Sequence, residues 1–102
     1  MAEFVTVAKA GDVPEGEMRA FEVGDRVVAI ANIGGDLWGF DDVCTHRMCS
    51  LAEGELEDNV VICACHGSEY DVTSGEVLGG PAPEDVDTFE VRVEGGEIQV
   101  RV

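Results

Sequence analysis

Cys44-Thr45-His46 and Cys63-Ala64-Cys65-His66, with sixteen residues between them, form the stretch of sequence that decides how this chain folds. Each segment offers one thiolate and one imidazole, so the two together can hold one metal centre. Soft sulfur and imidazole ligands favour zinc or an iron–sulfur cluster over magnesium or calcium. From the residue types alone, zinc and iron–sulfur both remain open, and the rest of the chain is interpreted as the scaffold of this centre.

That scaffold has the periodicity of β-strands, with β-branched and aromatic residues alternating with polar ones. Strands are expected over seven stretches, while helix signals are nearly absent: Phe4–Val7, Met18–Val23, Arg26–Asn32, Leu37–Phe40, Val60–Cys63, Thr88–Val93 and Ile98–Val102. The sequence therefore predicts an all-β fold built from short antiparallel strands.

Glycine-rich turns separate these strands at Val23–Arg26, Ile33–Asp36 and Glu94–Glu97, as tight hairpins with positive backbone φ require. Residues from 41 to about 80 interrupt the strand pattern and carry all four cysteines and both histidines. We expect one domain over residues 1–102, in which residues 41–80 form a small subdomain inserted between strands to hold the metal centre.

Length and charge exclude several classes of protein. The 102 residues contain no apolar run near the roughly 20 residues that span a bilayer, and the N-terminus resembles no secretion signal, so a cytoplasmic protein is expected. Acidic side chains outnumber basic ones by 22 to 6, giving a formal charge of −16. Nucleic acid and anionic membranes are not expected as partners, because binding either depends on lysine and arginine.

The acidic excess is concentrated around the ligand motifs. Between Val27 and Val91, Arg47 is the single basic side chain, against fourteen carboxylates. This charge has two interpretations: it keeps the protein in solution, or it steers the protein onto a partner with a basic docking patch.

The two ligand motifs, together with Gly67, Ser68, Tyr70, Asp71 and the Gly80-Pro81 loop, resemble the Rieske family, whose pattern is Cys-x-His followed at this spacing by Cys-x-x-His. The resemblance implies a Rieske fold, with a base of antiparallel strands like a sandwich or barrel and a small cluster-binding subdomain. It also implies one [2Fe–2S] cluster, with Cys44 and Cys63 on one iron and His46 and His66 on the other.

The same resemblance assigns roles to the neighbouring residues. Cys49 and Cys65 match a disulfide found in the Rieske proteins of respiratory and photosynthetic cytochrome complexes, although two free thiols are the alternative in the cytoplasm. Ser68 and Tyr70 match hydroxyl donors to cluster sulfurs, against ordinary roles in a turn and a core. A proline loop at Pro81 would cover the cluster, and Arg47 and Pro81 are expected to contact partners.

Three functions are compatible with this site. The first is a Rieske-type ferredoxin that carries one electron from a flavin-dependent NAD(P)H reductase to the terminal oxygenase of an aromatic-ring-hydroxylating dioxygenase. The second is a higher-potential subunit related to those of cytochrome bc complexes, and the third, least favoured, is a structural zinc module. Both histidines are used as cluster ligands, so no catalytic site is expected, and a carrier that alternates between partners is expected to be a monomer.

Two smaller expectations concern side chains next to the motifs. Trp38 and Phe40 lie at strand spacing on one face, where core packing is expected for both. Asp41 and Asp42 are interpreted as solvated charges of a loop.

Overall fold

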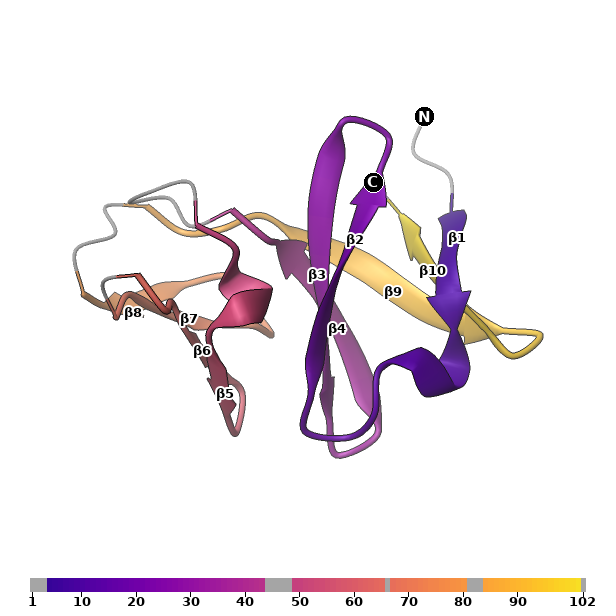
Figure 1. Cartoon of the computed structure of the whole chain (residues 1–102), viewed down its shortest axis with the longest axis horizontal. Coiled ribbons are helices and arrows are strands. Elements are labelled where there is room, and N and C mark those ends of the chain that lie inside the picture. The colour runs from indigo at the N-terminus through magenta and orange to yellow at the C-terminus, as the bar shows by residue number, and fades with distance from the viewer. Residues whose placement is uncertain (1–3, 44–48, 66, 81–83, 102) are drawn as a thin grey trace.

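The computed structural model describes residues 4–43, 49–65, 67–80 and 84–101, and this part of the chain is nearly all β-structure, as predicted (Figure 1). Ten strands follow one another in the order β1 Phe4–Lys9, β2 Met18–Val23, β3 Arg26–Ile33, β4 Asp36–Asp41, β5 Glu55–Glu57, β6 Val60–Ile62, β7 Glu69–Asp71, β8 Val77–Gly79, β9 Thr88–Glu94 and β10 Glu97–Arg101. Two single-turn 3-10 helices, η1 Ala10–Asp12 and η2 Leu51–Glu53, interrupt them. Neither these nor any other helix in the described residues is long and apolar enough to cross a membrane.

The strands form two antiparallel sheets. A six-stranded sheet has the order β1-β10-β9-β4-β3-β2, and its outer strands β1 and β2 contact each other, so that the sheet curves toward a barrel. A four-stranded sheet, β5-β6-β7-β8, comes entirely from the chain between β4 and β9 and lies at one end of the molecule (Figure 1). The interruption that the sequence shows after β4 is therefore a second, smaller sheet.

Glycines close the hairpins of the larger sheet, as the sequence predicts. Gly34 and Gly35 between β3 and β4 have φ of 61° and 95°, and Gly95 and Gly96 between β9 and β10 have φ of 60° and 79°. Side chains other than glycine rarely adopt such values, so these positions set where the strands reverse.

Strand β3 is buried on both faces and divides the core in two. Val28 and Ile30 face a cluster inside the curved sheet, whereas Ala29 and Ala31 face a second cluster shared with the small sheet. The alternation follows from the two-residue period of a strand. Apolar burial against β3 therefore holds the small sheet to the large one.

The expectation for Trp38 is wrong. Phe40 is fully buried opposite Ala29, but Trp38, two residues earlier on the same strand, keeps 36% of its surface exposed. Strands β4 and β9 pair only at Gly39–Phe89 and Phe40–Thr88 and then separate. Trp38 lies beyond this pairing and lines the cavity, of about 540 Å³, that opens between the two strands.

The expectation for Asp42 is also wrong, because this carboxylate is 4% exposed. Its Oδ1 accepts the backbone N–H of Ala52 at 2.8 Å, and its backbone carbonyl accepts that of Leu51 at 2.7 Å. The first N–H groups of a helical turn have no partner within the turn, and Asp42 supplies one from outside. It thereby joins the end of β4 to η2.

Gly54, directly after η2, generates the first testable prediction. A Cβ at this position would collide with the backbone carbonyl oxygen of Ile62 and lie 3.2 Å from the backbone nitrogen of Ala64. Backbone cannot move aside as a flexible side chain can, so we expect Gly54→Ala to lower the free energy of unfolding by about 1–3 kcal/mol. Chemical denaturation would measure the change.

Gly11→Ala is the matched control, since a Cβ there meets nothing within 4 Å and its φ is not positive. Equal unfolding midpoints for the Gly54 and Gly11 variants would contradict the close contact between Gly54 and the β6 end.

Candidate metal centre

The segment that contains the first ligand motif is closed at its base by backbone contacts. Val43 and Ser50 form an isolated antiparallel bridge, and the N–H of Val43 also donates to Asp41 Oδ1 at 3.0 Å. Val43 and Ser50, which lie on either side of the first motif in sequence, are therefore neighbours in space. Cys49 lies just inside this closure, directly before Ser50.

The second motif lies in the loop that joins β6 to β7. The N–H of Cys63 donates to the carbonyl of Ser68 at 2.8 Å, and the N–H of Gly67 donates to the carbonyl of Cys63 at 3.0 Å. Gly67 has a φ of 75°, which lets the backbone turn back toward Cys63. These bonds place Cys63 and Ser68 at the two ends of a tight loop.

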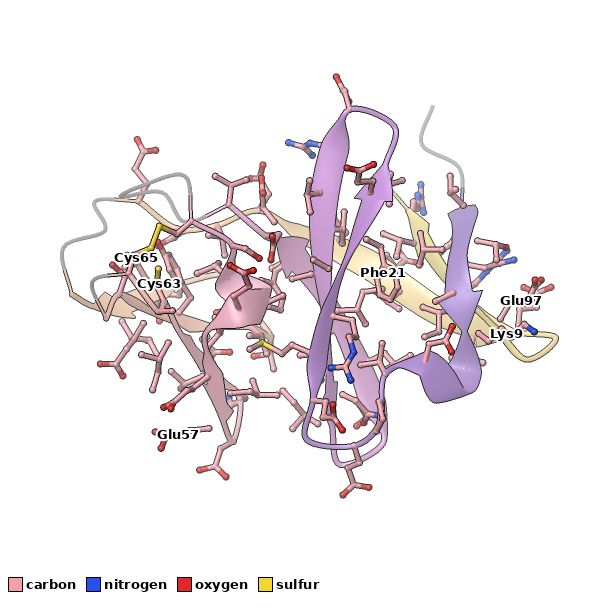
Figure 2. The ribbon with its side chains drawn as sticks, in the orientation of Figure 1. Lys9, Phe21, Glu57, Cys63, Cys65 and Glu97 are labelled. Atoms are coloured by element: carbon pink, nitrogen blue, oxygen red, sulfur yellow. A yellow bond between two sulfur atoms is a disulfide. The ribbon has the colours of Figure 1, made fainter. Side chains whose placement is uncertain are left out.

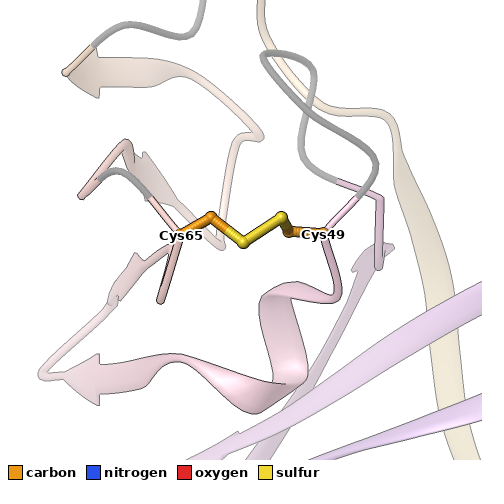
Figure 3. Close-up of a disulfide and its surroundings, with 2 residues drawn as sticks. All are labelled: Cys49 and Cys65. Carbon is orange, nitrogen blue, oxygen red and sulfur yellow. A yellow bond between two sulfur atoms is a disulfide. The ribbon is translucent and has the colours of Figure 1, made fainter.

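A disulfide between Cys49 and Cys65 links the two loops, and Figure 3 shows it bridging them from opposite sides. The two Cα atoms lie 6.6 Å apart, within the range that a disulfide spans. The pairing implied by the resemblance is thus present in the structure. It holds the first loop against the second, although the two are far apart in sequence.

Cys63 is the one free cysteine among the described residues, and it is 2% exposed. Its Sγ and those of Cys49 and Cys65 all lie within 4.8 Å of one another. Figure 2 shows the sulfur atoms of Cys63 and Cys65 together at the end of the molecule opposite Lys9 and Glu97. A buried cysteine sulfur therefore lies beside the disulfide that joins the two loops.

Ser68 adds a buried hydroxyl at the same place. The side chain is fully buried, and its Oγ has no hydrogen-bond partner in the part of the chain that the structure describes. Burying a hydroxyl without a partner costs about 1–3 kcal/mol, so most such groups in proteins serve a ligand or water. The Ser68 hydroxyl is free to donate to an acceptor bound between the loops.

Tyr70 and Gly80 complete the surroundings. Tyr70 is fully buried on β7, where it pairs with Val61 of β6 and belongs to the core cluster shared by the two sheets. A Cβ on Gly80, whose φ is 82°, would lie 2.6 Å from the Cα of Ser68. The backbone after β8 therefore packs directly against the second loop.

The hairpin between β7 and β8 is held by Asp71. The hydroxyl of Thr73 donates to Asp71 Oδ1 at 2.6 Å and the backbone N–H of Thr73 at 2.9 Å, and these bonds hold the pKa of Asp71 below its ordinary value. Because the pKa of Asp71 is lowered in the folded protein, these bonds contribute their full stabilisation at neutral pH. That contribution is lost as the pH falls through the pKa of Asp71. The resemblance includes Asp71 as part of the family pattern, and in the structure its hydrogen bonds hold the turn that follows β7.

Of the residues singled out by sequence, the structure brings together Cys49, Cys63, Cys65 and Ser68, with Tyr70 on the adjacent strand. Five further positions lie outside the described residues: Cys44, His46, Arg47, His66 and Pro81. The assignment of ligands to individual irons and of docking contacts to Arg47 and Pro81 stays a prediction.

Sequence reasoning missed the residues that shape the loops without contributing a donor atom. Gly54 contacts the end of β6, and Asp42 holds η2 beside it. Gly54 precedes an acidic segment and Asp42 precedes the first ligand motif. Nothing in the sequence distinguishes either residue from an ordinary exposed loop residue. A cavity of about 440 Å³ opens here, lined by Glu53, Gly54, Glu55, Ile62, Cys63, Ala64 and Gly67.

Comparison with known proteins identifies this arrangement. Residues 3–90 match the family model described as the Rieske [2Fe-2S] domain. The ferredoxin component of biphenyl 2,3-dioxygenase from Rhodococcus jostii (strain RHA1) is 36% identical over 94 residues, which are 92% of this chain and 88% of that protein. The cytochrome b6-f complex iron-sulfur subunit of Chlorobaculum thiosulfatiphilum is 38% identical over 92% of this chain but only 51% of its own length.

A solved structure, the complex of reduced oxygenase and oxidized ferredoxin in carbazole 1,9a-dioxygenase, contains a chain that superposes on this one with a TM-score of 0.89. The two are 32% identical, and the match covers 96% of this chain and 92% of that one. With a family match over most of its length and relatives of similar size, the chain belongs to the Rieske [2Fe-2S] domain family.

Proposed function

We propose that this chain is a Rieske-type ferredoxin, a one-electron carrier between a flavin-dependent NAD(P)H reductase and the terminal oxygenase of an aromatic-ring-hydroxylating dioxygenase. The observation that carries the proposal is the similarity to the ferredoxin component of biphenyl 2,3-dioxygenase, which is 36% identical over 92% of this chain and 88% of that protein. We further propose that residues 1–102 form one domain, with residues 41 to about 80 as its cluster-binding subdomain.

The described residues fit a [2Fe–2S] cluster. Cys63 offers a buried thiol that is not part of the disulfide, and Ser68 offers a buried hydroxyl whose oxygen has no hydrogen-bond partner in the described part of the chain. When bound, the cluster supplies a centre that gains and loses one electron, at about −150 to +300 mV where two histidines replace two cysteines. The Ser68 hydroxyl would donate to its sulfur and so favour the reduced form.

We assign Cys44 and Cys63 to one iron and His46 and His66 to the other. Two thiolates balance the charge of the oxidised core, so neutral imidazoles keep the site about neutral, whereas four thiolates would add two negative charges. The added electron is then easier to accept, which is the physical reason for histidine in this ligand set.

Both histidines are used in this assignment, so the chain offers no catalytic iron site of its own and acts only with other proteins. We place the docking surface at the histidine edge, with Arg47 and Pro81 among its contacts. A carrier that alternates between two proteins needs small, short-lived interfaces, and a monomeric cytoplasmic protein suits that role.

A second candidate is a higher-potential electron carrier of the cytochrome-complex kind. The observation that favours it is the Cys49–Cys65 disulfide, which the resemblance associates with those proteins. The chain spans about half of the length of the cytochrome b6-f subunit that it matches.

Electron paramagnetic resonance of the dithionite-reduced protein, followed by voltammetry, tests the proposal. We expect a rhombic signal with a low average g value, typical of mixed cysteine and histidine ligation, and a midpoint near about −150 mV. A silent protein with stoichiometric zinc would refute the carrier, and a midpoint near about +300 mV would favour the second candidate.

Ser68→Ala and Tyr70→Phe are each expected to lower the midpoint potential, because each removes a hydroxyl that we assign to the more negative, reduced cluster. The shift should be on the order of 50 mV, since a tenfold change in a one-electron equilibrium, about 1.4 kcal/mol, corresponds to about 59 mV. Ser74→Ala is the control: Ser74 is exposed, and its hydroxyl accepts only the N–H of Glu76. Unchanged voltammetry of the Ser68 and Tyr70 variants would remove both residues from the tuning of the cluster.

The exposed carboxylates of η2 and β5 are expected to steer the protein onto basic partners. Reversing Glu53, Glu55 and Glu57 to lysine should slow association with the reductase or oxygenase by roughly tenfold or more at low salt, and salt should diminish the difference. Stopped-flow electron transfer would measure the rate.

A control variant reverses three exposed carboxylates on the six-stranded sheet, Glu22, Asp25 and Glu97, and changes the net charge equally. If both variants slow electron transfer to the same extent, net charge alone is responsible and the carboxylates of η2 and β5 do not direct the approach to the partner.

A further inference from the structure

The chain places a free thiol beside its own disulfide. The Sγ of Cys63 lies within 4.8 Å of the Sγ atoms of both Cys49 and Cys65. A thiol–disulfide exchange needs only the approach of a thiolate to one sulfur of the disulfide, with a side-chain rotation to align it. The Cys63 sulfur is therefore an internal nucleophile for this bond.

Burial favours the internal reaction over an external one. Cys63 is 2% exposed, so small thiols in solution reach it poorly, whereas the disulfide is already its neighbour. Holding two reacting groups in contact raises the rate of their reaction far above that of the same groups free in solution. The hydrogen bonds between Cys63 and the backbone of Gly67 and Ser68 keep the thiol at this place.

We propose that, in the cluster-free protein, Cys63 exchanges with this disulfide and produces a Cys49–Cys63 isomer. The sulfur of Cys63 attacks Sγ of Cys49, and the proton of the Cys63 thiol is transferred to the leaving sulfur. The Cys49–Cys63 bond forms as the Cys49–Cys65 bond breaks, and the electron pair leaves on Cys65, which takes up a proton. One thiol and one disulfide are present before and after, so no oxidant or reductant is consumed.

Attack on Cys49 is the productive direction, because Cys49 belongs to the other loop and the new bond still joins the two loops. Bonding to Cys65 instead would close a small ring within one segment, since only Ala64 separates the two cysteines. The exchange would leave Cys65, which is exposed, as the free thiol.

The consequence is a competition between cluster insertion and disulfide isomerisation. When Cys63 is disulfide-bonded to Cys49 it cannot bind iron, so this isomer cannot take up the cluster until the exchange reverses. A Cys63 on iron cannot attack the disulfide, so the cluster protects the Cys49–Cys65 pairing. This protection rests on the proposed ligand role of Cys63; the exchange in the cluster-free chain does not.

Mapping of thiols in the full-length protein tests the proposal. The cluster is removed with an iron chelator under argon, the protein is held at pH 8, and samples are quenched over time with acid and N-ethylmaleimide. Cleavage after Arg47 and after Glu53, Glu55 and Glu57 puts Cys44, Cys49 and the Cys63–Cys65 pair on three different peptides. Mass spectrometry then identifies each labelled cysteine and each cross-link.

We expect the label to be lost from Cys63 and gained by Cys65, with a Cys49–Cys63 cross-linked peptide, while Cys44 stays labelled. In Cys63→Ser, the Cys49–Cys65 bond should persist unchanged. Label retained on Cys63 with an intact Cys49–Cys65 bond would overturn the proposal, as would loss of label from Cys44, which would show general scrambling.

The cluster-loaded protein under the same conditions separates this inference from the proposed function. If exchange occurs only after cluster removal, Cys63 is held by the cluster as proposed. If the loaded protein exchanges as fast as the cluster-free one, the internal nucleophile is correct but the ligand role of Cys63 is wrong.

Discussion

The covalent bond between Cys49 and Cys65 sets how closely the two motif-bearing loops approach each other. Both loops adjoin a four-stranded sheet whose strands are three residues long. A cross-link removes conformations from the unfolded chain and keeps two otherwise weakly attached segments together. Backbone contacts reinforce it, with Gly54 against Ile62 on one side and Gly80 against Ser68 on the other.

The scaffold supports these loops through a single strand. Because β3 is buried on both faces, Val28 and Ile30 close the interior of the curved sheet while Ala29 and Ala31 support the core under the small sheet. Tyr70 and Phe40 belong to that shared hydrophobic core, so the hydroxyl that we assign to the iron–sulfur cluster is carried by a buried residue of the core. A carrier benefits from such rigidity, since little reorganisation then accompanies each electron transfer.

Most of the larger sheet could be predicted from the sequence, because its strands are long enough to show alternation and each of its three hairpin turns contains glycine. Met18–Val23 and Thr88–Glu94 are recovered within a residue. Strands β5, β7 and β8 were not predicted: three residues cannot display a period of two, and Glu55–Glu57 is mostly charged. Trp38 and Asp42 were misassigned for a related reason, since burial depends on which element lies opposite and not on the residue type.

By itself, the sequence determined which residue types are available: two cysteines and two histidines in two short segments, one further cysteine beside or within each segment, and an excess of acidic residues around them. These are properties of residue type and spacing, which need no coordinates. Only the tertiary structure decided that Ser68 Oγ is buried without a partner in the described chain, and that Cys63 lies within reach of the disulfide. Both depend on contacts between segments that are distant in sequence, where packing of the two sheets, and not local preference, sets the distances.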